Sequence, residues 1–373
     1  MKGKLYKSGI LFLILIVVAF GIFSAKQPRD FNNKNPESTA RYIAIKNFGE
    51  KIYIFSPKDI ENKRKSLIDY IWKTEGFPQF KIPTEIDKDI KDNRYQDLIN
   101  LKKIEKIVTV MDYGVNSIAY LFHPIQTNNS LIIYNQGHDG DFIQGKDTIN
   151  FFLSKGYSVL AFSMPLLGMN NQPTLEISPF GKIKLTPIQG FRHDVLQFLQ
   201  AEEFSPIKFF LEPIAVSLNY VEKAFNFRSI SMIGLSGGGW TTTLYAAIDP
   251  RISKSYPVAG TLPIYLRSLN PNDFGDYEQM MPELYRIANY LELYILGSYG
   301  KGRKQFQILN KYDNCCFAGD GYKTYEEEIR KLLVRLKKGE FAVYLDDSHK
   351  EHKISEKALQ VIISDLGNKN IYE

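Results

Sequence analysis

The chain has 373 residues, 44% of them hydrophobic and 24% charged, which is enough to bury a large core in one large domain or two modest ones. Its formal net charge of +6 comes from lysines scattered among acidic residues, without a basic block interleaved with aromatics, and this argues against nucleic acid as a partner. The two cysteines are neighbours, Cys315 and Cys316, which excludes a disulfide framework and a multi-cysteine metal site.

The N-terminus differs from the rest of the chain. Three lysines within the first seven residues precede an uncharged, apolar run over residues 8–25. A positive flank followed by such a run is typical of an export signal or a membrane anchor. The run is long for a signal peptide and its last residues fit a cleavage site poorly. We therefore predict that residues 1–25 are a signal peptide or, preferably, an uncleaved anchor; a buried helix is the alternative.

Residues 26–105 form an N-terminal extension rich in Lys, Asn and Asp. One helix is indicated near its middle, because Ser56 can cap a helix that has Pro57 at its first position. Gly76 and Pro78 then stop this helix. We expect the extension to pack on the main domain rather than to fold alone.

The main domain is predicted over residues 106–373, where apolar segments with strand and helix patterns alternate. The predicted strands cover 107–111, 117–122, 131–134, 157–162, 230–233, 255–258, 305–309 and 341–345. The predicted helices cover 147–155, 209–225, 240–247 and 324–339, and a last one follows Ser355. Residues 168–207 and 261–290 lack periodicity, and we interpret them as insertions over the sheet. The pattern predicts an α/β fold with a mostly parallel sheet flanked by helices.

The sequence Gly234-Leu235-Ser236-Gly237-Gly238 lies between a predicted buried strand and a predicted helix. This context suits a nucleophile elbow, in which a sharp turn strains the serine and exposes its Oγ, and which only small flanking residues permit. Ser236 is therefore the predicted nucleophile. The alternative interpretation is a glycine-rich turn after a strand.

From about residue 104 to its end the chain resembles the α/β-hydrolase superfamily, in the elbow motif and in the order of its elements. The resemblance implies the fold of that superfamily and a serine hydrolase activity without a cofactor. A serine hydroxyl needs a base, and the base needs an orienting group. The superfamily order of Ser, then acid, then His implies that the base is in the loop after the last strand, which holds His349 and His352.

Of these two histidines, His352 is favoured, and His349 is the alternative base. The run His352-Lys353-Ile354-Ser355 leads into a capped helix, which is similar to the Gly-His-x-x-Ser pattern of carboxylesterases of the acyl-protein thioesterase type, with Glu351 in place of Gly. For the acid, Asp313 follows the penultimate strand, where the superfamily places its carboxylate. Asp320 is the alternative, and Asp313 could instead only cap its own turn.

The run Asn135-Gln136-Gly137-His138 is found where the superfamily carries its oxyanion loop, with Asn135-Gln136 replacing the usual His-Gly. The resemblance implies that the backbone N–H groups of Gly237 and His138 hold the oxyanion. The His138 side chain is assigned a structural or substrate-facing role. No metal site is expected, because the acids and histidines lack the helix-based spacing of metal ligands.

The predicted function is that of an exported or membrane-anchored serine hydrolase, in the class of carboxylic ester hydrolases. Ser236, His352 and Asp313 form its triad, and its substrate is a small or acylated molecule. Its other predicted contact is with the membrane, through the N-terminal segment. Two alternatives remain: a non-catalytic binding protein with the same fold, against which the filled triad argues, and an exported serine peptidase, which no residue separates from an esterase.

Overall fold

The computed structural model describes residues 51–177, 180–184, 193–267 and 273–367, which fall within one compact unit. The predicted signal peptide or anchor at 1–25 lies outside the described residues, as does the first part of the extension. Within the described ranges, no helix is both long and apolar enough to cross a membrane.

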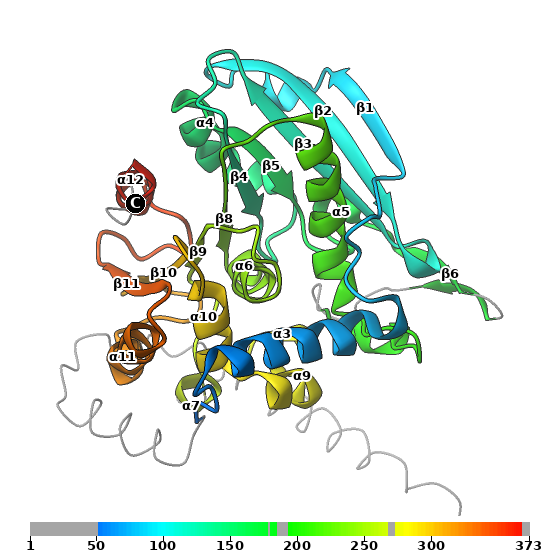
Figure 1. Cartoon of the computed structure of the whole chain (residues 1–373). Helices are drawn as coiled ribbons and strands as arrows, with labels where there is room; N and C mark the ends of the chain where they lie inside the picture. Colours follow the sequence, from blue (N-terminus) through cyan, green and yellow to red (C-terminus); the bar gives the residue numbers. More distant parts are fainter. Residues whose placement is uncertain (1–50, 178–179, 185–192, 268–272, 368–373) are drawn as a thin grey trace, which may run out of the picture. The chain divides into compact units, whose positions relative to one another are not determined.

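A large, mostly parallel sheet forms the centre of the described part (Figure 1). Its strand order is β1-β2-β3-β5-β4-β8-β9-β10-β11. The bounds are β1 Glu85–Ile90, β2 Leu101–Val110, β3 Asn116–Pro124, β4 Ser130–Asn135, β5 Ser158–Phe162, β8 Ser229–Leu235, β9 Lys254–Val258, β10 Lys304–Asn310 and β11 Glu340–Asp346. Strands from β5 to β11 run parallel, whereas β1, β2 and β3 add an antiparallel edge. The predicted α/β class is confirmed.

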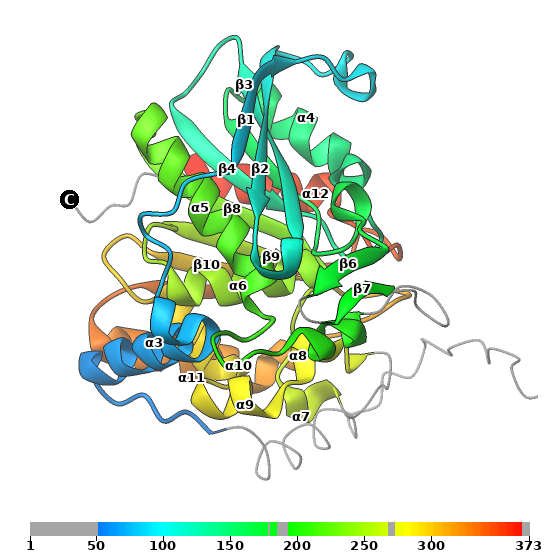
Figure 2. The ribbon, with the colours of Figure 1, turned by 90° about the vertical axis from the view of Figure 1, so that its right-hand side faces the viewer.

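Helices cover both faces of this sheet, as Figure 2 shows with α5 and α6 in front of it and α12 behind it. One apolar core holds α4 (Lys146–Ser154) and α12 (Glu356–Gly367). The other holds α3 (Pro57–Trp72), α5 (Lys208–Ala224), α6 (Gly237–Ile248), α10 (Tyr290–Ser298) and α11 (Glu326–Leu336). In β8, Met232 belongs to the second core and Ile233 to the first, because successive strand residues point to opposite faces.

The N-terminal extension packs on this architecture through a helix and an edge strand. Its helix α3 begins as predicted, with Ser56 and Asp59 forming a capping box, and ends at Trp72, whose indole N–H donates to buried Glu212 of α5 at 2.9 Å. Strand β1, which the sequence did not indicate, pairs with β2. Charged residues dominate β1 because it is an edge strand, and such a strand lacks the apolar alternation that reveals inner strands.

In their described residues, the two predicted insertions contain only short elements outside the main sheet. The first holds η5 (Gly168–Asn170), the small β6–β7 pair (Thr174–Ile177 and Gly181–Lys184) and η6 (His193–Leu199). The second holds α7 (Ile264–Arg267), α8 (Tyr277–Met280) and α9 (Pro282–Ile287). Helix α10 follows, and the sequence missed it because all nine of its residues are buried and it has no polar face to create a helical pattern.

The register places several strand ends at one edge of the sheet. Asn135 at the end of β4 pairs with Gly234 in β8, Leu235 pairs with Val258, and the last residues of β10 and β11 pair with each other. Loops that follow the carboxyl ends of parallel strands therefore meet at this edge, which is where sites of open α/β sheets form.

Candidate active site

Ser236 occupies the turn between β8 and α6 in a backbone conformation that non-glycine residues rarely adopt, with φ 56° and ψ −124°. Such a conformation costs about 1–3 kcal/mol and persists only where the surroundings enforce it. Here they do so through two hydrogen bonds. The Ser236 N–H donates to the Val258 carbonyl at 2.9 Å, and the Ser236 carbonyl accepts from the Trp240 N–H at 3.0 Å.

Glycines allow the chain segments around Ser236 to approach closely. A Cβ on Gly234 would lie 2.1 Å from the Gly238 carbonyl oxygen, and one on Gly238 would lie 2.1 Å from the Asn135 carbonyl oxygen. A Cβ on Gly137 would lie 2.8 Å from that of Ser236. Helix α6 thus begins against the end of β4 with no room for side chains, as the elbow motif predicts for Gly234 and Gly238.

Asp313 and His352 come together at the same edge of the sheet. His352 Nδ1 lies 2.8 Å from Asp313 Oδ2, and the Asp313 side chain is fully buried. Burial alone would raise the pKa of Asp313, but the hydrogen bond and charge of His352, with the Cys315 N–H, hold it below its usual value. Because an ionised carboxylate only accepts, Nδ1 carries the proton and Nε2 keeps its lone pair. Among the described residues, this buried Nε2 has no hydrogen-bond partner.

Two further side chains hold the loops that carry this pair. The Asn310 amide donates to Asp313 Oδ2 at 3.1 Å and to the Lys353 carbonyl at 3.0 Å, so it joins the acid's loop to the loop of His352. Asp346 accepts from the N–H and hydroxyl of Ser348 and from the hydroxyl of Ser355, which caps α12. Sequence reasoning did not single out Asn310 or Asp346.

His349 is placed differently from His352. Its Nδ1 lies 3.6 Å from Asp346 Oδ2 and 3.3 Å from the Ser348 hydroxyl, and its Nε2 is buried without a hydrogen-bond partner among the described residues. The carboxylate it faces is already engaged by two serines. The geometry favours His352, which has the shorter contact with a carboxylate that is otherwise bound only by N–H donors.

The oxyanion donors expected from the sequence flank Ser236. Gly237 is the first residue of α6, and His138 follows Gly137 in the loop after β4. In the described part of the chain, neither of the two N–H groups donates to a protein acceptor. Gln136, which replaces the usual glycine of the superfamily, has a structural role. Its side-chain carbonyl accepts from the Tyr134 hydroxyl and its amide N–H donates to Asp139, and these bonds hold the loop in place.

Comparisons with known proteins agree on the architecture. No protein-family model matches the sequence, and no curated protein is detectably similar to it. Two solved structures match this chain over nearly their whole length. One is an acetyl xylan esterase from Paenibacillus sp. R4, with 16% identity and a TM-score of 0.56 over 86% of this chain and 97% of that one. The other is acetyl xylan esterase 1 from Thermoanaerobacterium sp. JW/SL YS485, with 13% identity and a TM-score of 0.55 over 90% of this chain and 99% of that one. The protein has the α/β-hydrolase fold.

A third solved structure extends this similarity to a longer protein, the methylesterase BT1017, with 12% identity and a TM-score of 0.54 over 88% of this chain and 67% of that one. Identities this low establish the fold alone. Within the α/β-hydrolase fold the predicted residues occupy separate loops at one edge: Ser236 after β8, Asp313 after β10 and His352 after β11. The structure brings Asp313 and His352 into contact, whereas the Ser236 hydroxyl makes no hydrogen bond to any described residue.

The side chain of His138 contacts three residues that the sequence did not indicate as part of the site. Its ring lies against Gly237, where a Cβ would be 2.5 Å from the ring's Cε1. Its Nε2 faces His193, Asp276 and Glu278, which come from the two insertions. Burial would lower the pKa of His138, but the carboxylates, Glu278 first, raise it above its usual value. No sequence motif joins these four residues, so only their position in the fold reveals them.

Both cysteines lie in the loop after β10 that carries Asp313. Cys315 and Cys316 are joined as a disulfide between adjacent residues, and their N–H groups face Asp313 Oδ1 at 2.8 and 3.4 Å. With His352 they form one of two side-chain groups close enough to ligate a metal in the described ranges. Sulfurs in a disulfide are not thiolates, so this group is a poor metal site. The cluster around His138 is the second group.

Proposed function

We propose that the protein is a serine hydrolase that cleaves carboxylic esters of a small or acylated substrate. The observation that carries this proposal is the buried Asp313–His352 pair, 2.8 Å apart, at the sheet edge where the strained Ser236 also lies. His352 Nε2 has no hydrogen-bond partner among the described residues, so its lone pair is available to accept a proton. An orienting acid, a base and an exposed serine are the three parts that acyl transfer needs.

In the proposed reaction, Ser236 Oγ attacks the acyl carbon while His352 Nε2 takes its proton. Asp313 keeps the imidazole in the required tautomer and stabilises the imidazolium that forms. The N–H groups of Gly237 and His138 receive the negative charge of the tetrahedral intermediate, and a donor of this kind is worth about 3 kcal/mol. His352 then protonates the leaving alcohol, and a water activated by the same nitrogen releases the acid.

Esters are preferred over amides because of the named structural neighbours. Two are acetyl xylan esterases and one is a methylesterase, and each has a TM-score above 0.5. These names concern those proteins; for this chain they support an ester carbonyl as the reacting group.

The test uses the purified full-length chain, a fluorophosphonate probe and a panel of p-nitrophenyl esters from acetyl to palmitoyl, with matched p-nitroanilides. We expect covalent labelling of one serine and faster turnover of esters than of anilides. The length of the preferred acyl chain then measures the pocket. A folded chain that is neither labelled nor active on any ester would favour a binding protein, and faster turnover of anilides would favour a peptidase.

We also propose that the protein is exported and held at the membrane by residues 1–25. Three lysines followed by an apolar run support this, because such a pattern is retained at the membrane when cleavage fails. Cell fractionation with N-terminal sequencing is the measurement. We expect the membrane fraction to contain a chain that begins at or near Met1, with its hydrolase domain accessible to added protease. Recovery of an intact chain only from the cytoplasm would refute export.

A further inference from the structure

Four side chains that could ligate a metal ion converge beside Gly237, although they are distant in sequence. His138 comes from the loop after β4, His193 begins η6 in the first insertion, and Asp276 and Glu278 come from the second insertion. One ligand atom of each lies within 4.8 Å of all the others. His193 and Glu278 are fully buried, whereas His138 and Asp276 retain 24% and 19% side-chain exposure.

The three separations from His138 Nε2 are close to the edges of a coordination tetrahedron. His138 Nε2 lies 3.0 Å from His193 Nδ1, 3.1 Å from Glu278 Oε1 and 3.3 Å from Asp276 Oδ2, and His193 Nδ1 lies 3.6 Å from Glu278 Oε2. Nitrogen and oxygen ligands about 2.0–2.1 Å from a tetrahedral zinc ion are roughly 3.3–3.4 Å apart. Small movements of these side chains are enough to enclose such an ion.

Hydrogen bonding alone does not account for this arrangement. His193 Nε2 lies 2.9 Å from the Pro165 carbonyl, which can only accept, so Nε2 carries a proton and Nδ1 is the ring nitrogen that faces the cluster. His138 Nε2 then has three acceptors around it and at most one proton to donate. A backbone carbonyl that fixes the outer nitrogen of an imidazole is also the usual support of a metal-bound histidine.

The charges of the cluster likewise call for a cation. Within the described residues, neither Asp276 nor Glu278 forms an ion pair with a lysine or arginine, and the fully buried Glu278 Oε2 has no hydrogen-bond partner. A buried carboxylate needs a counter-charge, which here either a protonated imidazole or a metal ion supplies. When both imidazoles ligate a metal, the nitrogens that face it are deprotonated, and the four side chains then carry a charge of −2, which one divalent ion neutralises.

We propose that His138, His193, Asp276 and Glu278 bind one divalent ion of the zinc class. Two imidazole nitrogens and two carboxylate oxygens suit zinc, and four protein ligands leave no open position for a reacting water, which is the pattern of structural rather than catalytic sites. The ion fastens both insertions to the loop that carries the proposed oxyanion donor. Its role is to hold this side of the site in place, and it is independent of whether the substrate is an ester.

The experiment measures metal content and cobalt binding of the full-length chain. We expect about one equivalent of zinc to remain after dialysis against metal-free buffer. After removal of zinc with a chelator, added Co²⁺ should give the strong visible absorption of a four-coordinate site. The chelator should lower the melting temperature, and zinc should restore it.

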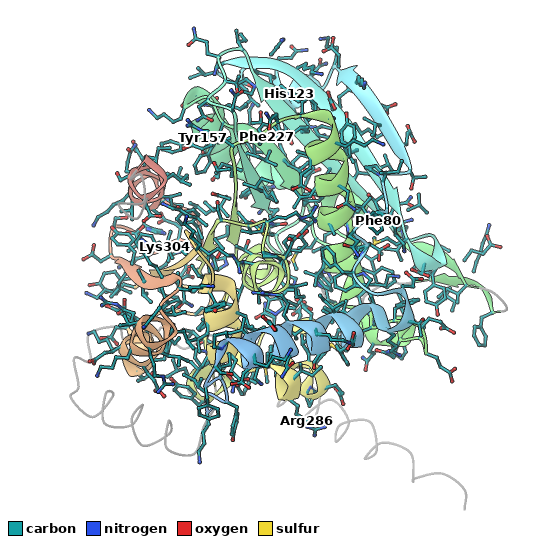
Figure 3. All side chains as sticks on the ribbon, viewed as in Figure 1. Phe80, His123, Tyr157, Phe227, Arg286 and Lys304 are labelled. Carbon is teal, nitrogen blue, oxygen red and sulfur yellow. A yellow bond between two sulfur atoms is a disulfide. The ribbon has the colours of Figure 1, made fainter. Side chains whose placement is uncertain are left out.

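A matched pair of substitutions separates the cluster from other buried His–Glu pairs. Glu278→Gln should weaken zinc binding at least about 100-fold, because a charged ligand is replaced by a neutral amide of the same shape. Glu105→Gln should leave zinc binding unchanged. Glu105 is as buried as Glu278 and lies 3.3 Å from His123, so it is a matched His–Glu pair. His123, labelled in Figure 3, lies near the amino ends of the parallel strands, at the opposite edge from the cluster.

Two results would overturn the proposal. One is a folded wild-type chain that contains no zinc and takes up neither Zn²⁺ nor Co²⁺, which would mean that the two imidazoles share protons instead. The other is a Glu278→Gln variant with wild-type affinity. If Glu278→Gln does not fold, Asp276→Asn at the partly exposed position serves in its place and should lower the affinity for zinc at least about tenfold.

Discussion

Replacing Ser236 with alanine is expected to abolish both fluorophosphonate labelling and ester hydrolysis while changing the free energy of unfolding by less than about 0.5 kcal/mol. The Ser236 hydroxyl makes no hydrogen bond to any described residue, so its loss breaks no contact, and alanine keeps the Cβ that the turn already accommodates. Intact-protein mass after labelling, turnover of the best ester and urea unfolding measure the three quantities. Labelling that survives in Ser236→Ala would assign the nucleophile to another residue.

The proposed acid of the triad can be tested in the same way, with Asp320→Asn as the control for Asp313→Asn. Asp313→Asn should lower kcat about 10⁴-fold, because the amide favours the wrong imidazole tautomer and gives no charge to the imidazolium. Asp320→Asn should leave kcat nearly unchanged, since Asp320 pairs with Lys323 at 2.6 Å. The opposite ranking of the two variants would transfer the role of the acid to Asp320.

Much of the fold could be predicted from the sequence because many of its elements are marked by patterns among neighbouring residues. The alternation of Met232 and Ile233 between two cores, and the cap at Ser56, appear within a few residues of the chain. The elbow is local for the same reason, since its glycines and its serine are consecutive. By contrast, the helix predicted over residues 324–339 begins only at Glu326, and the Thr324 hydroxyl donates to the Gly321 carbonyl instead of capping it.

The remainder could not be predicted because it depends on contacts between distant segments. The Asn310 amide matters through its bond to the Lys353 carbonyl, 43 residues later, and no pattern near Asn310 announces this. The cluster around His138 joins segments up to 140 residues apart. Its four members lack the fixed spacing that marks metal ligands on one helix, so the sequence does not indicate a metal site where the structure places four ligand atoms together.

Among the two histidines of the last loop, we expect only His352 to be essential. His352→Ala should lower the rate of single-turnover acylation by about 10⁴-fold or more, close to the effect of losing Ser236, because the members of a triad act as a unit. The reason is geometric: His352 Nδ1 is 2.8 Å from a carboxylate bound otherwise only by N–H groups, and this contact aims its free Nε2.

His349→Ala is the matched substitution in the same loop and should cost at most about tenfold, roughly 1.4 kcal/mol. His349 lies 3.6 Å from Asp346, and that carboxylate already holds the loop through Ser348 and the cap of α12 through Ser355. Loss of the His349 imidazole therefore removes a weak contact and leaves the loop supported. Rapid-quench measurement of acylation in both variants decides between them, and a larger loss in His349→Ala would make His349 the base and Asp346 its orienting acid.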